Sequence, residues 1–304
     1  MKHYKALGRG LAALTIGVLL LGAIAPFFSS YQASAAGITW HTETVDSSGN
    51  VGYYTSLAFD SAGNPAISYF DYAQADLKYA RWDAAKGKWV GLSDRDKPDT
   101  VDSTGQVGLY TSLAFDPKDK NPSISYYDAT NYELEYAHWN GSTWVKQPPV
   151  DTDGNVGSYT SLAFDPDDNF PSISYYDATY DATDPKYELK YAHWNGSTWD
   201  RKKVDLAGNV GTYTSLAFDS NKSPAISYYD VTNGDLKLAW DRNKNGKFDA
   251  DAGEIVTVDG AGADVGRYTS LSFDAIGYPA ISYYDATKAL LKFAHWNGSK
   301  WDIE

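Results

Sequence analysis

Apolar and aromatic residues occur in short runs along most of the chain, and turn-forming residues separate these runs. The runs TSLAF, AISYY, LKYAHW and TWVK are typical. Each is rich in β-branched or aromatic residues and is bounded by Asp, Gly, Pro or Asn. Helical periodicity is missing after residue 36. This pattern predicts short β-strands in that part of the chain.

The same set of runs recurs five times. Each copy contains V-D, then V-G-x-Y-T-S-L-A-F-D, then P-A/S-I-S-Y-Y-D, then L-K-Y-A-H-W-N-G-S-T-W, with some variation. Near copies such as FDPKDKNPSISYYDAT (115–130) and FDPDDNFPSISYYDAT (164–179) show how closely the units agree. The Tyr-Thr-Ser tripeptides are spaced by 56, 49, 54 and 55 residues and begin at Tyr54, Tyr110, Tyr159, Tyr213 and Tyr268.

Each unit reads as four strands. The third and fourth meet at Asn-Gly in WNGSTW, a strong hairpin signal because both turn positions tolerate φ > 0. Four-stranded units with a period near 50 residues are typical of β-propeller blades, which bury their faces by stacking around an axis. A β-solenoid would need shorter rungs, and a sandwich would not repeat this closely. The sequence therefore predicts an all-β propeller of five four-stranded blades.

Closure of the ring depends on the two ends of the repeat. The segment ITWHTETVD at 38–46 matches the fourth strand of a unit, as in TWVKQPPVD, but precedes the first Y-T-S. The final residues, KWDIE, also begin a fourth strand and then stop. We expect the N-terminal segment to complete the last blade, so that N- and C-terminal strands pair. The other strand is then surplus, or it marks an incomplete sixth blade.

The first 35 residues have the layout of a secretory signal peptide. Basic MKHYKALGRG is followed by the apolar run LAALTIGVLLLGAIAPFF and by an A-x-A cleavage site at Ala33-Ser34-Ala35. We expect residues 1–35 to be removed and residues 36–304 to form one secreted propeller domain; the alternative is an uncleaved membrane anchor. Nothing after residue 36 is apolar enough to span a bilayer, so no membrane contact is expected after cleavage.

Charge narrows the range of partners. Removing Lys2, Lys5 and Arg9 with the signal leaves 26 − 3 = 23 basic against 39 acidic residues, a net charge of −16. Such a surface repels nucleic acid and anionic membranes and favours cations. Cysteine is absent, so neither disulfides nor thiol chemistry are expected despite export. We expect a monomer that binds extracellular glycans or a surface protein.

Two sets of loops are expected on one face of the ring, because strand order runs from the axis outwards and connections alternate between faces. They carry Asp46, Asp71, Asp102, Asp128, Asp151, Asp177, Asp205, Asp230, Asp259 and Asp285, with Tyr54, Tyr110, Tyr159, Tyr213 and Tyr268 close by. Two interpretations stay open. The aspartates cap turns and tie neighbouring blades, with Tyr hydroxyls satisfied between sheets. Alternatively, Asp, Tyr and Gly backbone form five equivalent sugar pockets, in which carboxylates accept hydrogen bonds from vicinal hydroxyls and aromatic faces stack on a pyranose.

The fourth unit replaces the short N-G-S turn by DRNKNGKFDADAGE at 241–254, called the insertion below. Oxygen ligands at loop positions 1, 3, 5, 7 and 9 can wrap one Ca²⁺, and Gly at position 6 allows the sharp turn. Those positions are Asp241, Asn243, Asn245, Lys247 (through its carbonyl) and Asp249, with Asp251 or Glu254 to supply the remaining carboxylate. The pattern resembles EF-hand loops and, more closely, the calcium loops of integrin-type propellers; it departs from the EF-hand at position 12, Ala252. We expect one structural Ca²⁺; the alternative is a solvated polar hairpin.

The hairpins WNGSTW (139–144 and 194–199) and WNGSKW (296–301) resemble the Asp-box turn of sialidase-type propellers, S-x-D-x-G-x-T-W. Asn140, Asn195 or Asn297 stands in place of the Asp. In that family the box is a fold element remote from the active site, so the resemblance implies architecture rather than sialidase activity. The whole region after residue 36 resembles bacterial secreted β-propeller repeat proteins with Asp-box-like turns, a group united by fold more than by activity.

Catalysis is not favoured by the sequence. Glycosidases use a few acids from different blades, each in its own environment, and such acids should break the repeat. The non-repeated acids instead cluster in expected surface insertions, among them Asp94, Asp96 and Asp99. A sialidase would need three arginines, and only Arg267 lies near the Y-T-S loops. We expect a non-catalytic, lectin-like module; a protein-binding adhesion or scaffold propeller is the alternative, and a glycoside hydrolase or sialidase-like enzyme comes third.

Overall fold

The computed structural model describes residues 42–180 and 187–304. The chain divides into Met1–Glu43 and Thr44–Glu304, and the fold described here is that of the second unit. The predicted signal peptide at 1–35 lies outside the described residues. No helix in the described ranges is long and apolar enough to cross a membrane.

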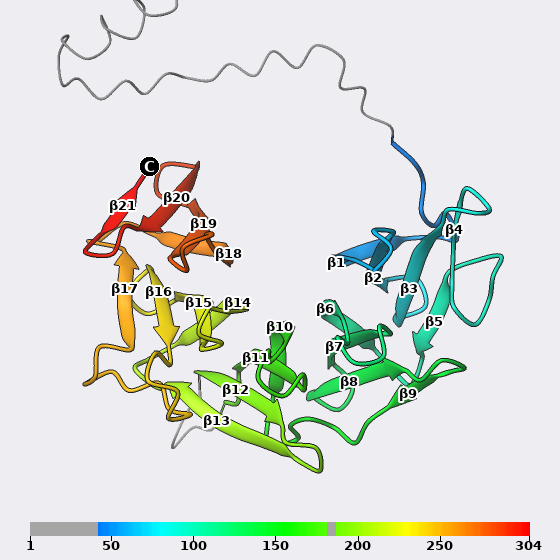
Figure 1. Ribbon diagram of the computed structural model, residues 1–304, viewed down its shortest axis with the longest axis horizontal. Helices are drawn as coiled ribbons and strands as arrows, with labels where there is room; N and C mark the ends of the chain where they lie inside the picture. The colour runs from blue at the N-terminus through cyan, green and yellow to red at the C-terminus, as the bar shows by residue number, and fades with distance from the viewer. Residues whose placement is uncertain (1–41, 181–186) are drawn as a thin grey trace, which may run out of the picture. The chain divides into compact units, whose positions relative to one another are not determined.

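Residues 51–303 form five antiparallel sheets, the blades, which follow one another around a common axis (Figure 1). In every blade the first strand lies nearest the axis and the others follow outwards in chain order. The predicted all-β fold of five blades is confirmed.

The strand bounds follow the repeat closely. Blade 1 has β1 (Val51–Phe59), β2 (Pro65–Asp71), β3 (Asp76–Asp83) and an outer strand in two pieces, β4 (Lys88–Val90) and β5 (Asp99–Asp102). Blade 2 has β6 (Val107–Phe115), β7 (Pro122–Asp128), β8 (Glu133–Trp139) and β9 (Trp144–Lys146). Blade 3 has β10 (Val156–Phe164), β11 (Pro171–Asp177), β12 (Glu188–Trp194) and β13 (Trp199–Asp205). Blade 4 has β14 (Val210–Phe218), β15 (Pro224–Asp230), β16 (Asp235–Trp240) and β17 (Ile255–Asp259). Blade 5 has β18 (Val265–Phe273), β19 (Pro279–Asp285), β20 (Leu290–Trp296) and β21 (Trp301–Ile303).

Each inner strand is irregular where the sequence reads V-G-x-Y-T-S. In blade 3, the register between β10 and β11 shifts twice, between Val156 and Ser158 and between Ser158 and Ser161. The tyrosine of every Y-T-S tripeptide lies in the left-handed region, with φ between 53° and 55°. A bulky residue rarely adopts this conformation, so the surrounding strands must hold it in place.

The same apolar contact joins each blade to the next. A third-strand leucine lies against the glycine of V-G-x-Y in the following blade, so closely that a Cβ atom on Gly157 would come 2.7 Å from the Cα atom of Leu134. The glycine is therefore required for packing as well as for its positive φ. Equivalent pairs, with Cβ to Cα distances of 2.7–2.8 Å, are Leu77 with Gly108, Leu189 with Gly211 and Leu236 with Gly266.

In blades 2 to 4, the two tyrosines of Y-Y-D donate hydrogen bonds to the links on both sides of the blade. In blade 3, the Tyr175 hydroxyl donates to Asp151 Oδ2 of the preceding link at 2.7 Å, and the Tyr176 hydroxyl donates to Asn209 Oδ1 before blade 4 at 2.8 Å. The first of these bonds recurs at 2.6–2.7 Å in Tyr69–Asp46, Tyr126–Asp102, Tyr228–Asp205 and Tyr283–Asp259. The predicted structural role for this group of Asp and Tyr residues is present in the structure.

The last blade is completed from the C-terminal side. Strand β21 pairs with β20, and Phe293 and Glu304 exchange backbone hydrogen bonds beyond it. Residues 42–46 form no strand, and residues 38–41 lie outside the described ranges. In the described residues the fourth strand of blade 5 is therefore β21, which follows directly from its own Asn-Gly hairpin, and the expected contribution of residues 38–41 lies outside those residues.

Candidate functional site

The ten aspartates of the predicted sugar face accept hydrogen bonds from groups of the protein itself. Eight of them, all except Asp46 and Asp259, are buried. The five in the links accept the inter-blade tyrosine hydroxyls described above. Those of Y-Y-D cap the loop that follows: Asp128 Oδ1 accepts the backbone N–H of Thr130 at 2.7 Å and of Asn131 at 3.1 Å. Asp71, Asp177, Asp230 and Asp285 accept equivalent bonds. These carboxylates have partners inside the protein, so they are poorly placed to bind a sugar.

A lysine on the third strand neutralises most of the link aspartates. The Lys190 ammonium contacts Asp151 Oδ2 at 2.5 Å and Asp177 Oδ2 at 3.4 Å. Burial by itself raises the pKa of Asp151, but the hydrogen bonds from Lys190 and Tyr175 outweigh it and hold the pKa below its ordinary value. Lys237 and Lys292 contact the link aspartates Asp205 and Asp259 in the same way.

Blade 2 breaks this rule, because Glu135 occupies the position of those lysines. Its side chain is 3% exposed, and its Oε2 atom has no hydrogen-bond partner. Burial raises the pKa of Glu135 to about 7; Lys146 opposes this shift and Asp102 adds to it. The sequence carried the signal, since Leu-Glu at 134–135 replaces the Leu-Lys of the other four units.

Carboxyl groups with divergent pKa values, such as Glu135 and Asp102, are a pattern seen in acid–base catalysis. Here a substrate cannot reach Glu135, because the side chain is buried between strands. Asp99, expected in a surface insertion, is instead 2% exposed at the start of β5 and accepts the Trp144 indole N–H at 3.0 Å. Glu135 and Asp99 are therefore not placed for catalysis in this structure.

The five tyrosines of the Y-T-S tripeptides, in contrast, come together at the axis. Neighbouring ring centroids are 4.6, 4.5, 4.7 and 4.5 Å apart along the series Tyr54, Tyr110, Tyr159, Tyr213 and Tyr268. With the threonine that follows each of them, they line a cavity of about 230 Å³, called the axial cavity below. One of the two interpretations of the sequence placed these tyrosines in five separate pockets, whereas the structure gathers them around one cavity.

The axial cavity offers aromatic faces and hydroxyl groups. None of its ten lining residues is an acid or a base. The Tyr110 hydroxyl interacts with those of Tyr54 and Tyr159, and burial raises the pKa of Tyr110 and of Tyr159 to about 12. Both phenols are therefore neutral at physiological pH. Such a lining suits an uncharged ligand that has both apolar C–H surfaces and hydroxyl groups.

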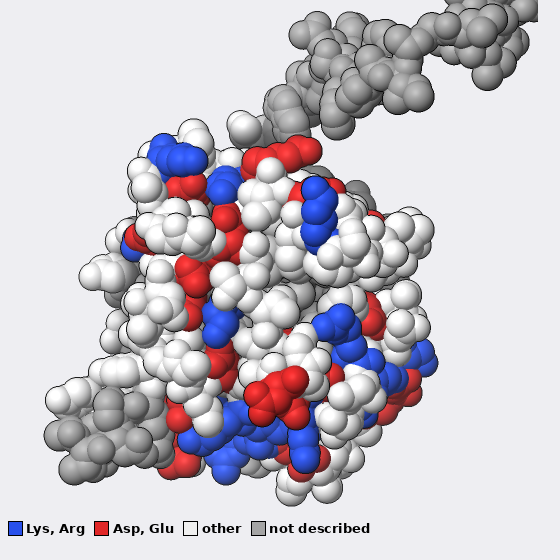
Figure 2. All heavy atoms as spheres, turned by 90° about the vertical axis from the view of Figure 1, so that its left-hand side faces the viewer, with Lys and Arg blue, Asp and Glu red and all other residues white. Residues whose placement is uncertain are grey.

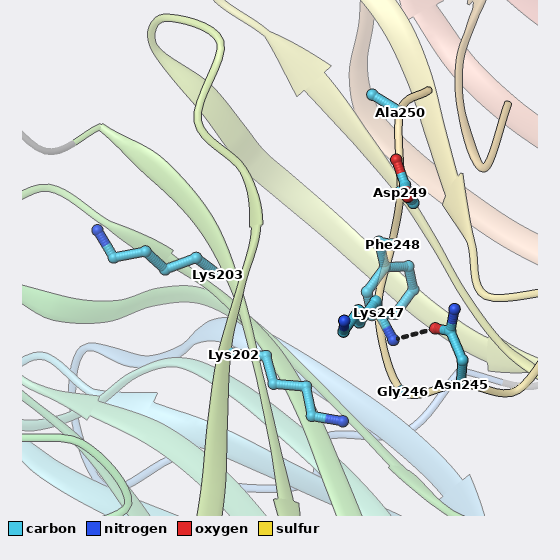
Figure 3. A pocket seen from close by; sticks show the side chains of 8 residues that line it. All are labelled: Lys202, Lys203, Asn245, Gly246, Lys247, Phe248, Asp249 and Ala250. Carbon is cyan, nitrogen blue, oxygen red and sulfur yellow. Dashed lines mark hydrogen bonds between the residues drawn. The ribbon is translucent and has the colours of Figure 1, made fainter. Parts of the chain in front are cut away.

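The insertion packs on blade 3. In blades 2 and 3 the fourth-strand tryptophan packs on a third-strand tyrosine of the preceding blade, as Trp199 does on Tyr136, with ring centroids 5.5 Å apart. In blade 4 the insertion supplies Phe248 instead, with its centroid 5.8 Å from that of Tyr191. Lys244 contacts Asp167 of blade 3. Figure 3 shows the insertion opposite Lys202 and Lys203 of β13. These two lysines and residues 245–250 line an open cavity of about 670 Å³.

Two buried carboxylates lie at the base of the insertion. Asp241 is 2% exposed and accepts the backbone N–H groups of Asn245 at 3.1 Å and Gly246 at 2.9 Å. Glu254 is 3% exposed and accepts the N–H of Asp249 at 2.9 Å. Burial raises the pKa of Asp241, and the charge of Glu254 adds to the rise. Glu254, rather than exposed Asp251, is therefore the acid that faces the loop.

Two further clusters combine histidine with aspartates. His193 with Asp165 and Asp168, and His138 with Asp116 and Asp119, each bring three ligand atoms within 4.8 Å of one another. Both ring nitrogens already have partners, however: His193 Nδ1 lies 2.9 Å from Ser172 Oγ and Nε2 lies 3.0 Å from Asp168 Oδ2. Hydrogen bonding within the blade accounts for these clusters.

Charge of both signs is mixed on the side of the ring shown in Figure 2. Acidic side chains lie among neutral ones, and Lys and Arg gather towards one end. This side lacks the continuous basic stripe typical of nucleic-acid binding.

No protein-family model matches the chain, and no curated protein matches it in sequence. Solved structures do share its fold. An α-L-arabinofuranosidase of Fusarium graminearum, in complex with an iminosugar inhibitor, matches with a TM-score of 0.56 and 13% identity over 84% of this chain and 80% of that one. A mutant of AofleA from Arthrobotrys oligospora matches with a TM-score of 0.53 and 16% identity over 82% and 72%. A microbial sialidase matches with a TM-score of 0.53 and 10% identity over 82% and 57%. These similarities show the fold alone.

Proposed function

We propose that this protein is a secreted, non-catalytic propeller that binds extracellular glycans in the manner of a lectin. The observation that carries the proposal is the axial cavity. Five left-handed tyrosines, each an unfavourable backbone conformation, point their rings and hydroxyls into one uncharged space. Backbone strain of this kind is concentrated at ligand sites, where the surrounding fold stabilises it.

The chemistry of a saccharide matches this lining. The C–H groups on one face of a pyranose pack against an aromatic ring, and its hydroxyls exchange hydrogen bonds with neutral phenols and threonines. Among the solved structures with this fold, an arabinofuranosidase and a sialidase act on sugars by name, which supports the ligand class without supplying residues.

The protein-binding alternative requires an exposed apolar patch. Large exposed apolar side chains do occur, and those of Leu57, Phe59, Leu291 and Phe293 lie on the edges of blades 1 and 5. These side chains are the two halves of the inter-blade contact, and their packing on each other within the chain is proposed in the next subsection. Glycan binding therefore remains the better-supported function.

A glycan array probed with residues 36–304 tests the proposal, followed by calorimetry on a bound glycan. Replacing Tyr159 by alanine removes one aromatic face from the axial cavity and is expected to weaken binding about tenfold, equivalent to ~1.4 kcal/mol. Tyr132→Ala is the matched control, because Tyr132 is also left-handed and exposed but lies in the loop between β7 and β8.

Equal losses in both variants would remove the site from the axial cavity. Binding to no glycan, with or without calcium, would overturn the function itself and leave a protein-binding scaffold as the better explanation. Loss of binding in EDTA alone would link the glycan site to a bound cation.

We also propose that the insertion holds one structural Ca²⁺. Asp241 and Glu254 are like charges buried close together. The same loop carries further oxygen ligands of the kind that Ca²⁺ prefers, among them the side chains of Asn243 and Asn245, whose oxygens here accept backbone N–H groups at 2.9 and 2.8 Å. Asn243 and Asn245 side chains and the Lys247 carbonyl would complete the ligand set, with Asp249. A bound cation would relieve the repulsion and fix the insertion on blade 3 through Phe248.

Chelation should therefore destabilise the protein. At a calcium concentration one hundred times its Kd, binding stabilises the folded state by ~2.7 kcal/mol, so EDTA should lower the Tm by about 5–10 °C. Asp241→Asn should abolish the difference between calcium and EDTA, whereas Asp251→Asn, on the exposed side of the insertion, should preserve it. A Tm that is the same in calcium and EDTA for the unmodified protein would contradict a calcium site.

A further inference from the structure

The face of blade 1 that points away from blade 2, called its outward edge below, carries one half of the inter-blade contact. Among the described residues, no other blade packs on it. Leu57 is 59% exposed, whereas its four equivalents, Leu113, Leu162, Leu216 and Leu271, are 6–7% exposed. A Cβ atom on Gly52 would meet nothing within 4 Å, although every equivalent glycine is packed on a leucine. A cavity of about 180 Å³, lined by Val45, Gly52 and Ile67 among others, marks the unfilled position.

The outward edge of blade 5 carries the missing half of that contact. Leu291 pairs with Tyr284 in the register that places Leu134 opposite Tyr127 in blade 2, so it is the third-strand leucine of blade 5. It is 83% exposed, and its four equivalents in blades 1 to 4 are fully buried. Phe293, two residues later, is also exposed. The inner strands pack in succession from β1 through β6, β10 and β14 to β18, but no comparable packing joins β18 to β1 in the described ranges, and Figure 1 shows these two strands apart.

Polar groups at the two edges match as well. Within the ring, a threonine of one blade bonds to a serine of the preceding blade: Thr111 Oγ1 lies 2.7 Å from Ser68 Oγ, and Ser125 Oγ lies 2.8 Å from Thr160 Oγ1. The corresponding residues at the edges are Thr55 on blade 1 and Ser282 on blade 5. The two edges are thus complementary in both apolar and polar groups.

We propose that blade 5 docks on blade 1 of the same chain and closes the ring. Leu291 then seats against Gly52 as Leu134 does against Gly157. Asp46, which already accepts the Tyr69 hydroxyl at 2.6 Å, takes the place beside Leu291 that Asp102 takes beside Leu77. Residues 44–46 thereby continue the outer strand of blade 5 beyond Glu304, so the two chain ends share one strand position.

Two physical arguments favour docking within one chain over docking between two copies. Both halves of the contact lie on one polypeptide, which makes their effective concentration high. A second copy that docked through its own blade 5 would bring four more blades into the space beside the first ring. Head-to-tail contacts of that kind produce larger rings or filaments.

Engineered cysteines test this closure directly, because the chain contains no native cysteine. Thr55→Cys with Ser282→Cys places one thiol on each edge. Thr111→Cys with Ser68→Cys is the matched control, at an equivalent pair that is already in contact within the ring. After mild oxidation of the full-length protein, we expect both pairs to form an intramolecular disulfide, seen as a monomer with altered mobility on non-reducing gels.

Two outcomes would overturn the proposal. A disulfide-linked dimer from the Thr55 and Ser282 pair would assign the edge to a second copy. Free thiols in that pair, when the control pair is oxidised, would show that the ring stays open.

A glycine substitution gives an independent measurement. Gly52 and Gly157 have positive φ values of 93° and 106°, so alanine strains the backbone at both. In a closed ring Gly52→Ala also clashes with Leu291, and it should lower the Tm as much as Gly157→Ala does. A clearly smaller decrease for Gly52→Ala would contradict closure.

Discussion

Replacing Asp151 by alanine is expected to destabilise the protein by about 3 kcal/mol or more, because it leaves a buried lysine and a buried phenol without their main partner. Asp151 is 1% exposed and accepts from Lys190, Arg201 and Tyr175. For a domain of this size the loss corresponds to a decrease in Tm of roughly 6–12 °C. Thermal unfolding followed by circular dichroism would measure it.

Asp46→Ala provides the matched control. Asp46 accepts the Tyr69 hydroxyl, but it is only partly buried and no ammonium is in contact with it among the described ion pairs. We expect a cost of about 1–2 kcal/mol, typical of losing the hydrogen bonds from the Tyr69 hydroxyl and the Ser48 N–H without leaving a buried charge unpaired. Equal losses at the two positions would show that the buried lysine does not set the energy of the link.

Glu135→Lys is expected to stabilise the protein. The substitution gives blade 2 the residue that Lys190 provides in blade 3, and it removes a buried carboxyl whose Oε2 has no partner. The raised pKa of Glu135, about 7 against an ordinary value of 4.5, corresponds to roughly 1–3 kcal/mol at pH 8 after allowance for screening. We expect the Tm at pH 8 to rise by about 2–12 °C.

The pH dependence gives the prediction a second readout. A carboxyl group with a raised pKa in the folded state contributes stability below its unfolded pKa, and that stability is lost as pH rises through the folded pKa. Unmodified protein should therefore lose this part of its stability between about pH 4.5 and pH 7. The gain from Glu135→Lys should be larger at pH 8 than at pH 5.

The reciprocal variant, Lys190→Glu, places a carboxylate beside Asp151 and Asp177 in blade 3. It should destabilise the protein at pH 8 and less so at pH 5. A gain from Glu135→Lys that is the same at both pH values would contradict the ionisation of Glu135 as its cause.

The repeat made the fold predictable because each unit carries both halves of its contacts. The leucine of L-K-Y and the glycine of V-G-x-Y are visible in every unit, and Leu134 with Gly157 shows how they meet. Strand number and blade number follow from that regularity. Which chain end supplies the fourth strand of the last blade was harder to predict, because ITWHTETVD and KWDIE both match the fourth strand of a unit; in the described residues β21 holds that position.

The site was less predictable, because its geometry depends on backbone conformation and on partners in other units. The sequence Y-T-S does not reveal that Tyr159 has a φ of 54°. Each tyrosine that lines the axial cavity has this left-handed conformation, so the cavity could not be predicted from the sequence. Asp151 looked equally suited to a sugar and to a turn, and only its contact with Lys190 distinguishes them. Glu135, by comparison, could have been found by aligning the five units with one another.

The insertion illustrates a different limit. The spacing of its candidate calcium ligands was visible in the sequence, but the replacement of a packing tryptophan by Phe248 was not. The sequence repeat predicts the packing of blades that have the regular Asn-Gly hairpin. It gives no information about the packing of the insertion, which replaces that hairpin in blade 4.

The pairing of leucine with glycine also has a consequence for how such a chain changes in length. Every blade offers a protruding surface on one side and a matching recess on the other, and neither depends on which blade comes next. Duplication or deletion of one whole unit would therefore leave each remaining junction chemically intact. The curvature of the ring, rather than the inventory of contacts, would then limit how many units one chain can carry.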